Sequence, residues 1–260
     1  KLKKKRLFLL KKFKNFSFYK EDIRNKNKLL KIFKKYYFSN VVHLAAQAGV
    51  RYSVQKPDLY FSNNLKGFFN ILDASRLFKI KHLVFASSSS VYGDSSKFPI
   101  NENFNTDNPL SFYAATKKSN EVMAHSYANI YKLPLTCLRF FTVYGPYGRP
   151  DMSLFKFCYA IKNKKKIDLF NKGKHVRDFT HVDDAVLSII KILKKIPNGT
   201  IPFEKYNIGS DKPIKLVNFL RIIENNLNLK AKANLLNIQK GDVLKTHASI
   251  KSLFKKIKYK

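Results

Sequence analysis

"KHLVFASSSS", residues 81–90, joins an apolar run directly to four consecutive serines. A short apolar run that contains aromatic and β-branched residues is typical of a buried strand. A helical pattern, SFYAATKKSNEVMAHSYANIY, follows over 111–131, and a second strand pattern, LPLTCLRFFTVYG, covers 133–145. Buried strands joined by a helix of this length indicate a parallel sheet that is covered by helices on both faces.

The same alternation continues on both sides of this unit. We expect strands at 16–20, 40–46, 167–170 and 205–209, and helices at 27–38, 58–79, 152–164, 181–195 and 214–228. Because crossovers between parallel strands are right-handed, this order favours a doubly wound α/β sheet. We predict a sheet domain over 1–145 and a smaller substrate lobe over 146–260, which is interleaved with the sheet domain and closes over its carboxyl edge.

The composition is that of a folded and strongly basic protein. The chain has 260 residues, a hydrophobic content of 45% and 23 Phe, which is enough to build a sizeable core. Its net charge is +34, but only eight of the 51 basic residues are Arg, and the lysines are scattered along every segment. A nucleic-acid footprint is clustered and bears Arg, so we expect no nucleic-acid partner.

The sequence also bears on compartment and metals. No apolar run reaches the length of a membrane span, and the basic opening KLKKKRLFLLKKFKNF (1–16) has no clean signal-peptide core. Cys137 and Cys158 lie in apolar stretches, which is typical of buried thiols in a reducing compartment. No Cys/His cluster has the spacing of metal ligands. We therefore expect a cytoplasmic protein with no membrane partner and no metal.

Tyr113 and Lys117 lie four residues apart at the start of the helix expected over 111–131, so they share one helix face. Ligands bind at the carboxyl ends of the strands in a doubly wound sheet, where the serine run also lies. A tyrosine that acts as a base near pH 7 must have its pKa lowered by about three units, or about 4 kcal/mol. A neighbouring ammonium group supplies part of that shift, so the pattern allows a catalytic acid–base pair.

Chance is the competing explanation for this pair. A chain so rich in lysine is expected to contain about two such tyrosine–lysine spacings by accident. The second pair, Tyr52 and Lys56, has no serine strand beside it and is followed by Pro57. We interpret that second pair as accidental. On pattern alone, Tyr113 as a packing residue beside an ordinary serine turn stays open.

Six short segments, two of which contain the serine run and the Tyr113–Lys117 pair, follow one another along the chain. They read HLAAQAGVRYS (43–53), ASSSSVYG (86–93), YAATK (113–117), RFFTVYGPYGRPDM (139–152), RDFTHVDD (177–184) and YNIG (206–209). This set resembles the extended short-chain dehydrogenase/reductase family, and within it the NAD-dependent nucleotide-sugar 4-epimerases. The resemblance implies a Rossmann-like fold, NAD as cofactor and a homodimer that pairs through two helices, one of them the helix that carries Tyr113.

The resemblance also implies the reaction. It is closest to the members that convert UDP-glucuronate to UDP-galacturonate by transient oxidation at C4 and re-reduction on the opposite face. Related dehydratases and uronate decarboxylases carry acidic residues in the turn before Val-Tyr-Gly, where this chain has Ser89 and Ser90. Without a carboxylate there, re-reduction is the easy fate of the 4-keto sugar. UDP-glucose or a related sugar remains the alternative substrate.

Site residues follow from the resemblance, position by position. It implies that Ser88, Tyr113 and Lys117 are catalytic, with Tyr113 as base and acid and Lys117 holding the nicotinamide ribose and lowering the tyrosine pKa. It implies cofactor contacts at Asp22, Ile23, Ala45, Ala46, Asn64, Ser87, Tyr113 and Lys117. It implies substrate contacts at Gln47, Arg51, Ser89, Ser90, Thr142, Arg149, Arg177 and Asp242, with Asp151 in the same region and Arg177 on the diphosphate.

Plainer roles stay open for several of these residues. Asp22 could instead cap the helix that follows it, and Arg177 could be a surface charge at a helix end. We interpret His43 and His181 as structural.

The glycine content and the net charge set two further alternatives. The chain has only nine glycines, and the first is Gly49. The resemblance implies that the glycine-rich strand–turn–helix of the family would precede Lys1 and that a final helix would follow Lys260. An inactive fragment without a pyrophosphate cradle is therefore one alternative. A basic nucleic-acid or membrane-surface protein that keeps the fold is the other, and it rests on the net charge.

Overall fold

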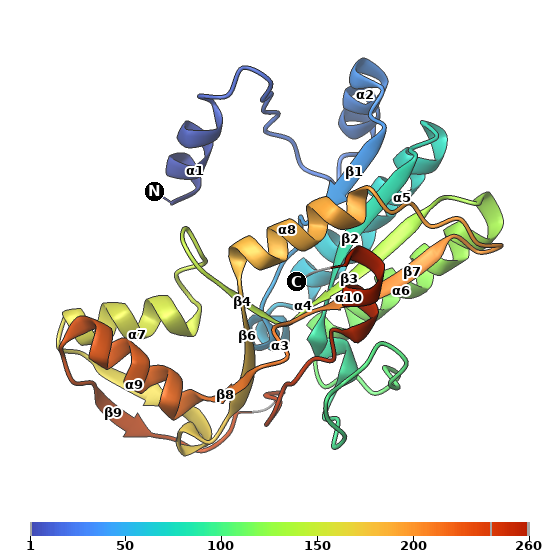
Figure 1. Cartoon of the computed structure of the whole chain (residues 1–260). Helices are drawn as coiled ribbons and strands as arrows, with labels where there is room; N and C mark the ends of the chain where they lie inside the picture. Colours follow the sequence, from blue (N-terminus) through green and yellow to red (C-terminus); the bar gives the residue numbers. More distant parts are fainter. Residues whose placement is uncertain (1, 240, 259–260) are drawn as a thin grey trace.

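The computed structural model describes residues 2–239 and 241–258 (Figure 1). Its helices are α1 (Leu2–Leu10), α2 (Lys26–Tyr36), α3 (Val50–Gln55), α4 (Pro57–Tyr60), α5 (Gly67–Leu77), α6 (Phe112–Tyr131), α7 (Ser153–Lys162), α8 (Val182–Leu193), α9 (Leu216–Leu227) and α10 (Lys251–Ile257). Its strands are β1 (Asn40–His43), β2 (His82–Ser88), β3 (Leu135–Phe140), β4 (Thr142–Tyr144), β5 (Lys166–Leu169), β6 (Val176–His181), β7 (Phe203–Ile208), β8 (Pro213–Lys215) and β9 (Lys232–Leu235).

The main sheet has the order β1-β2-β3-β7, and every neighbouring pair in it is parallel. Helices α2, α5 and α6 pack on one face, against Leu83, Phe85 and Leu135. Helices α8 and α10 pack on the other face, against Val84 and Leu138. Alternate residues of the same strand thus face opposite helix layers. The predicted α/β sheet with helices on both faces is confirmed.

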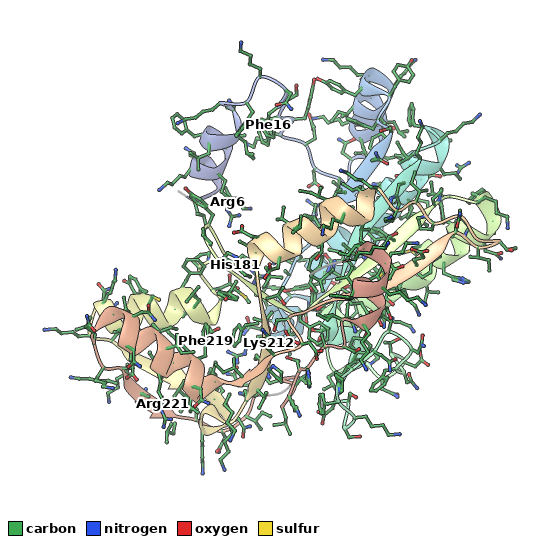
Figure 2. All side chains as sticks on the ribbon, viewed as in Figure 1. Arg6, Phe16, His181, Lys212, Phe219 and Arg221 are labelled. Atoms are coloured by element: carbon green, nitrogen blue, oxygen red, sulfur yellow. The ribbon has the colours of Figure 1, made fainter. Side chains whose placement is uncertain are left out.

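The second half of the chain forms a lobe beside this sheet and also contributes to it. Strands β4-β6-β8 form a three-stranded sheet, and β5-β9 form a two-stranded one. Helices α7 and α9 pack on these strands, and α9 carries Phe219 (labelled in Figure 2). The Phe219 ring stacks on Phe179 of β6 with ring centroids 4.2 Å apart. Strand β7 and helices α8 and α10 belong to the main sheet layers. The division at residue 145 and the interleaving of the two parts stay predictions.

Two expected strands differ in the structure. Residues 16–20 form no strand, and their side chains are largely exposed because they make no ladder with β1 or any other described strand. The strand expected over 133–145 is two strands: β3 pairs with β7 as far as Phe140, and the chain then crosses to pair with β6 through Thr142. A continuous apolar run cannot reveal such a change of sheet, because composition does not say which strand each part pairs with.

The helices differ less from expectation. The helix expected over 58–79 is α4 and α5 joined by a π-helical turn over Phe61–Lys66. Helix α2 begins at Lys26 with Asn25 as its N-cap, because the Asn25 side chain accepts from the Lys28 backbone N–H. Asp22 is therefore not the cap of this helix. Within the described ranges, no helix has the length and apolar character needed to cross a lipid bilayer.

Candidate active site

The carboxyl ends of β1, β2 and β3 lie side by side. The register pairs His43 with Phe85 and Ser88 with Phe140, so the three strands end within a few residues of one another. The loop after β1, the serine turn after β2 and Thr142 after β3 therefore start from one edge of the sheet. Polar groups from three distant parts of the sequence converge there, which is where a doubly wound sheet binds its ligands.

Ser88 and Tyr113 meet at this edge. The Ser88 hydroxyl caps the short 3-10 turn Ser89–Tyr92, because it accepts from the Ser90 N–H at 3.2 Å. Ser111 caps α6 by accepting from the Ala114 N–H at 3.2 Å, which places Tyr113 in the first helical turn. Burial raises the pKa of Tyr113, while a hydrogen bond with the Ser88 side chain and the charge of Arg149 act in the opposite direction.

Lys117 lies one turn further along α6 and is buried. Its Nζ donates to the Ala86 carbonyl oxygen of β2 at 2.8 Å. Burial lowers its pKa to about 8, against the opposing effects of Cys137 and Glu121. The expectation that Lys117 lowers the pKa of Tyr113 differs from this structure, in which the lysine side chain is directed to the β2 backbone. The cation that acts on the phenol here is Arg149.

Ser87 faces the opposite side of β2 from Ser88. Its hydroxyl donates to Glu121 Oε1 at 2.5 Å inside the protein, and its side chain is almost fully buried. A strand alternates its side chains between two faces, so consecutive serines cannot both point into one crevice. Any contact of Ser87 with a cofactor would therefore involve its backbone.

The loop after β1 exposes small residues and is tied to α6. Ala45 and Ala46 are exposed, so the backbone there is open to a flat ligand. Asn64 is buried; its Oδ1 accepts from the Gln47 N–H at 2.8 Å, and its Nδ2 donates to the Gln47 carbonyl and to Thr116 Oγ1. Asn64 thus fixes the Gln47 loop against the helix that carries Tyr113.

Asp22 and Ile23 lie beyond this loop, near the start of α2. Asp22 forms an ion pair with Arg24 at 2.6 Å, and hydrogen bonds from Arg24 lower its pKa to about 2. The Ile23 side chain packs on Gly67, where an added Cβ would lie 2.6 Å from Ile23 Cδ1. Both side chains of this ion pair are exposed, so the Asp22 carboxylate can be reached by a ligand from solvent.

A cavity of about 600 Å³ opens between this edge of the main sheet and the lobe. It brings together the predicted substrate residues Arg51, Thr142, Arg149, Arg177 and Asp242, together with Asp151. A second cavity of about 140 Å³ shares three of these residues and adds Ser89 and Ser90. Gln47 lines neither cavity and is held by Asn64 as described above.

The large cavity is rich in guanidinium groups. Arg51 pairs with Asp242 at 2.9 Å and lies over the Phe170 ring at 4.4 Å, and Arg149 pairs with Asp151. Arg177 donates to the Leu244 carbonyl, and burial lowers its pKa, with Asp242 acting in the opposite direction. Guanidinium groups in this density suit an anionic ligand that offers several oxygens.

His43 and His181 have structural contacts, as expected. His43 is buried against the Phe68 ring, and burial together with Lys117 lowers its pKa to about 3. His181 ends β6 and caps α8, since its Nδ1 accepts from the Asp183 N–H at 3.4 Å (Figure 2). Among the residues that the structure describes, no group of His, Cys, Asp and Glu side chains is arranged to hold a metal ion.

Sequence reasoning missed two sets of residues. Glu121 and Arg139 form a buried ion pair behind Ser88; the four-residue spacing from Lys117 to Glu121 was the signal that could have found it. The other set lines the large cavity and comprises Lys156, Lys166, Asp168 and His175. In a chain with lysine in every segment, those lysines carry no distinguishing pattern.

Comparison of the sequence with models of known protein families identifies the family of this chain. The profile of the NAD dependent epimerase/dehydratase family matches residues 2–209, which is most of the chain. The chain belongs to the NAD-dependent epimerase/dehydratase family. It shares with that family the parallel sheet and the dependence on NAD.

Individual members of this epimerase/dehydratase family are similar over nearly the whole chain. Protein CapI of Staphylococcus aureus is 48% identical over 95% of this chain and 78% of its own length. The UDP-glucuronate 4-epimerase of Thermodesulfobacterium geofontis is 44% identical over 96% of this chain and 76% of its own length. The crystal structure of a Bacillus cereus UDP-glucuronic acid 4-epimerase, in complex with UDP-glucuronic acid and NAD, has a TM-score of 0.93 and is 31% identical, covering 100% of this chain and 81% of that one.

The residues at the carboxyl edge fit the NAD of this family. Ala45 and Ala46 leave the backbone after β1 open, and the buried Lys117 ammonium lies behind it. The Asp22 carboxylate, an acceptor suited to ribose or adenine donors, is exposed just before the start of α2. A dinucleotide at the carboxyl edge would meet the small apolar surface of Ala45 and Ala46.

Proposed function

We propose that the protein catalyses the 4-epimerisation of UDP-glucuronate to UDP-galacturonate. The observation that carries the proposal is the pairing of Ser88 with Tyr113 beside a cavity in which Arg149 acts on the same phenol. A catalytic hydroxyl pair thus lies next to a cation that can meet a sugar carboxylate. Relatives named as UDP-glucuronate 4-epimerases support the choice of sugar.

The chain's own residues move a proton at the sugar. NAD, held where Ala45, Ala46 and Lys117 lie, would supply hydride transfer at C4. Tyr113 Oη takes the proton of the 4-hydroxyl as the C4–H bond breaks, and Ser88, whose side chain acts to lower the pKa of the phenol, would orient that hydroxyl. When hydride returns to the other face of the 4-keto sugar, Tyr113 gives the proton back. No net oxidation results, and the cofactor is regenerated in each cycle.

The serine turn favours epimerisation over other fates of the keto sugar. Elimination after oxidation needs an acid–base group placed beside the ring, and decarboxylation of the β-keto acid needs a proton donor for the enolate that it leaves. Ser89 and Ser90 fill the turn, and Ser90 Oγ accepts from Ser88 Oγ at 3.2 Å. Three carboxylates line the large cavity: Asp151 and Asp242 are paired with arginines, and Asp168 accepts a hydrogen bond from Asn234 Nδ2 at 3.0 Å. The intermediate therefore has re-reduction as its open route.

We assign the remaining predicted residues to the two ends of the ligands. Arg177, whose half-buried guanidinium lines both cavities, would bind the diphosphate, and Asp242 would lie near the nucleotide. Arg149 and Arg51 would pair with the glucuronate carboxylate, beside Thr142. The cofactor contacts would be Asp22, Ile23, Ala45, Ala46, Asn64, the Ser87 backbone and Lys117.

Product analysis tests this function. The protein, produced from its complete reading frame, is incubated with NAD and UDP-glucuronate, and the sugar signals are followed by proton NMR. We expect UDP-galacturonate to accumulate to equilibrium with no stoichiometric NADH. A UDP-pentose product would overturn the argument from the serines. Turnover of UDP-glucose but not of UDP-glucuronate would replace the substrate and keep the reaction.

We further propose that the protein is a cytoplasmic homodimer. Helices α5 and α6 present large exposed apolar side chains, including Phe69, Leu77, Val122 and Ile130. A patch of this kind marks an interface in a protein of this size. The unpaired cysteines Cys137 and Cys158 fit a reducing compartment. Sedimentation should give a dimer, and Val122→Asp together with Ile130→Asp should give a monomer; a monomeric wild type would exclude this interface.

A further inference from the structure

Glu121 is a buried carboxylate that the proposed reaction does not use. It lies on α6, one turn after Lys117 and two turns after Tyr113, so the three side chains share one face of the helix. Only 4% of Glu121 is exposed, and its carboxylate accepts three hydrogen bonds from residues of two strands, β2 and β3. A buried charge needs such partners to be tolerated, so its environment is specific to it.

The partners of Glu121 lie next to the proposed catalytic serine. Ser87 Oγ of β2 donates to Oε1 at 2.5 Å, and Arg139 of β3 donates through Nε to Oε1 at 3.0 Å and through Nη2 to Oε2 at 2.6 Å. Ser87 and Arg139 are register partners in the sheet. The Glu121 carboxylate therefore binds side chains of the adjacent strands β2 and β3 at one register position, and the β2 residue is the one before Ser88.

Lys117 makes a second tie between the same helix and the same strand. Its Nζ donates to the Ala86 carbonyl at 2.8 Å, one residue before the contact of Glu121 with Ser87. Two successive turns of α6 are thus fixed to two successive residues of β2. Sliding the helix by a fraction of a turn would break both ties and would separate the phenol from the serine hydroxyl.

We propose that Glu121 is a positioning residue that sets the register of α6 against β2 and so brings Tyr113 to Ser88. The proposal rests on the proposed function for the reaction that it serves. Arg139 completes the device, because its Nη1 also donates to the Glu102 carbonyl and its guanidinium lies 4.8 Å from the centre of the Tyr92 ring. These two contacts orient the Arg139 guanidinium independently of its ion pair with Glu121.

The charge of Glu121 also acts on Lys117. The groups that face Lys117 are His43 from β1, Cys137 from β3 and Glu121 from its own helix. Burial lowers the pKa of Lys117, whereas Cys137 and Glu121 raise it, and the result is about 8. Removal of the Glu121 charge lowers that pKa further, so Lys117 loses its proton at a lower pH.

Glu121→Gln tests the proposal, because it keeps the shape and removes the charge. We expect kcat for epimerisation to fall by roughly 10- to 100-fold, as small displacements of catalytic groups do. The KM for the UDP-sugar should change little, and the alkaline limb of the kcat–pH profile should move to lower pH. The matched control is Glu102→Gln, an equally buried carboxylate whose side chain contacts Asn207 and Ser252. It should leave the alkaline limb in place.

The same data can overturn the proposal. A merely structural Glu121 predicts a rate that falls only with the folded fraction measured by circular dichroism, and an unmoved alkaline limb. If Glu121→Gln does not fold, Ser87→Ala takes its place, since it removes one hydrogen bond from the carboxylate. A lower kcat with unchanged NAD affinity would then support the proposal, and an unchanged kcat would refute it.

Failure of the proposed function is distinguishable from failure of this inference. If the wild-type protein epimerises no UDP-sugar, the function is wrong, and the inference is judged by the titration of Lys117 itself. Its side-chain carbon is followed by NMR in labelled protein and assigned by its loss in Lys117→Met. A Lys117 pKa in Glu121→Gln below that of the wild type supports the electrostatic link, and equal values refute it.

Discussion

The phenol of Tyr113 is the group on which the proposed chemistry depends most directly. Tyr113→Phe removes the hydroxyl but keeps the edge-to-face contact with Tyr60, whose ring centroid is 6.1 Å away. We expect kcat to fall by roughly 10²- to 10⁴-fold, the range of general acid–base catalysis. NAD affinity, measured by calorimetry, should stay unchanged. The surface residue change Tyr159→Phe is the control, and equal rates in both variants would exclude Tyr113 as the base.

Arg149 decides the sugar in the present proposal. Arg149→Gln removes the cation that acts on Tyr113 and that would meet the glucuronate carboxylate. We expect the KM for UDP-glucuronate to rise by roughly 10-fold or more, the scale of one charge-assisted hydrogen bond. The KM for UDP-glucose should change much less. Arg221→Gln, on the exposed side of α9, is the control; equal effects on both sugars would remove Arg149 from the carboxylate site.

Helix α6 carries the site, and its first turn depends on a cap. Ser111→Ala removes the hydroxyl that accepts from the Ala114 N–H, so we expect a loss of about 1 kcal/mol in the free energy of unfolding. Ser119→Ala in the same helix is matched to it, because that hydroxyl bonds to the Ala115 carbonyl, which the helix already satisfies. Urea titration measures both. Equal stability of the two variants would contradict the capping role.

The elements with strong periodicity could be predicted from the sequence, and those that depend on a neighbour could not. The helix over 111–131 has both an apolar face and a serine cap, and the structure places α6 at Phe112–Tyr131. The run over 16–20 has strand composition but forms no ladder, because a strand needs a partner that composition does not name.

In the site, too, some features could be predicted from the sequence and others depend on a neighbouring element. The segments around Ser88, Tyr113 and Arg149 converge, and motif order is enough to anticipate that convergence. The direction of the Lys117 side chain was not predictable, since it depends on the Ala86 carbonyl of another element. The Glu121–Arg139 pair likewise requires knowledge of which residues stand opposite in β2 and β3.

At the scale of the whole molecule, the buried histidine His43 makes the free energy of unfolding depend on pH. Burial holds the pKa of His43 at about 3 in the folded protein, against 6.5 in the unfolded chain. Its contribution to stability is therefore fully present above pH 6.5 and is lost as the pH falls toward 3. We expect His43→Phe to flatten the fall of Tm over this range. A wild-type slope in His43→Phe would contradict the assignment.

Return of the same hydride to the same carbon is the central claim for the molecule as a whole. UDP-glucuronate that carries deuterium at C4 is converted in ordinary water, and the product is analysed by NMR and mass spectrometry. The account predicts UDP-galacturonate that retains deuterium at C4, because a deuteride transferred to a nicotinamide would form a C–D bond that does not exchange with water and would return to the same carbon. Loss of the label to solvent, or a decarboxylated product, would contradict it.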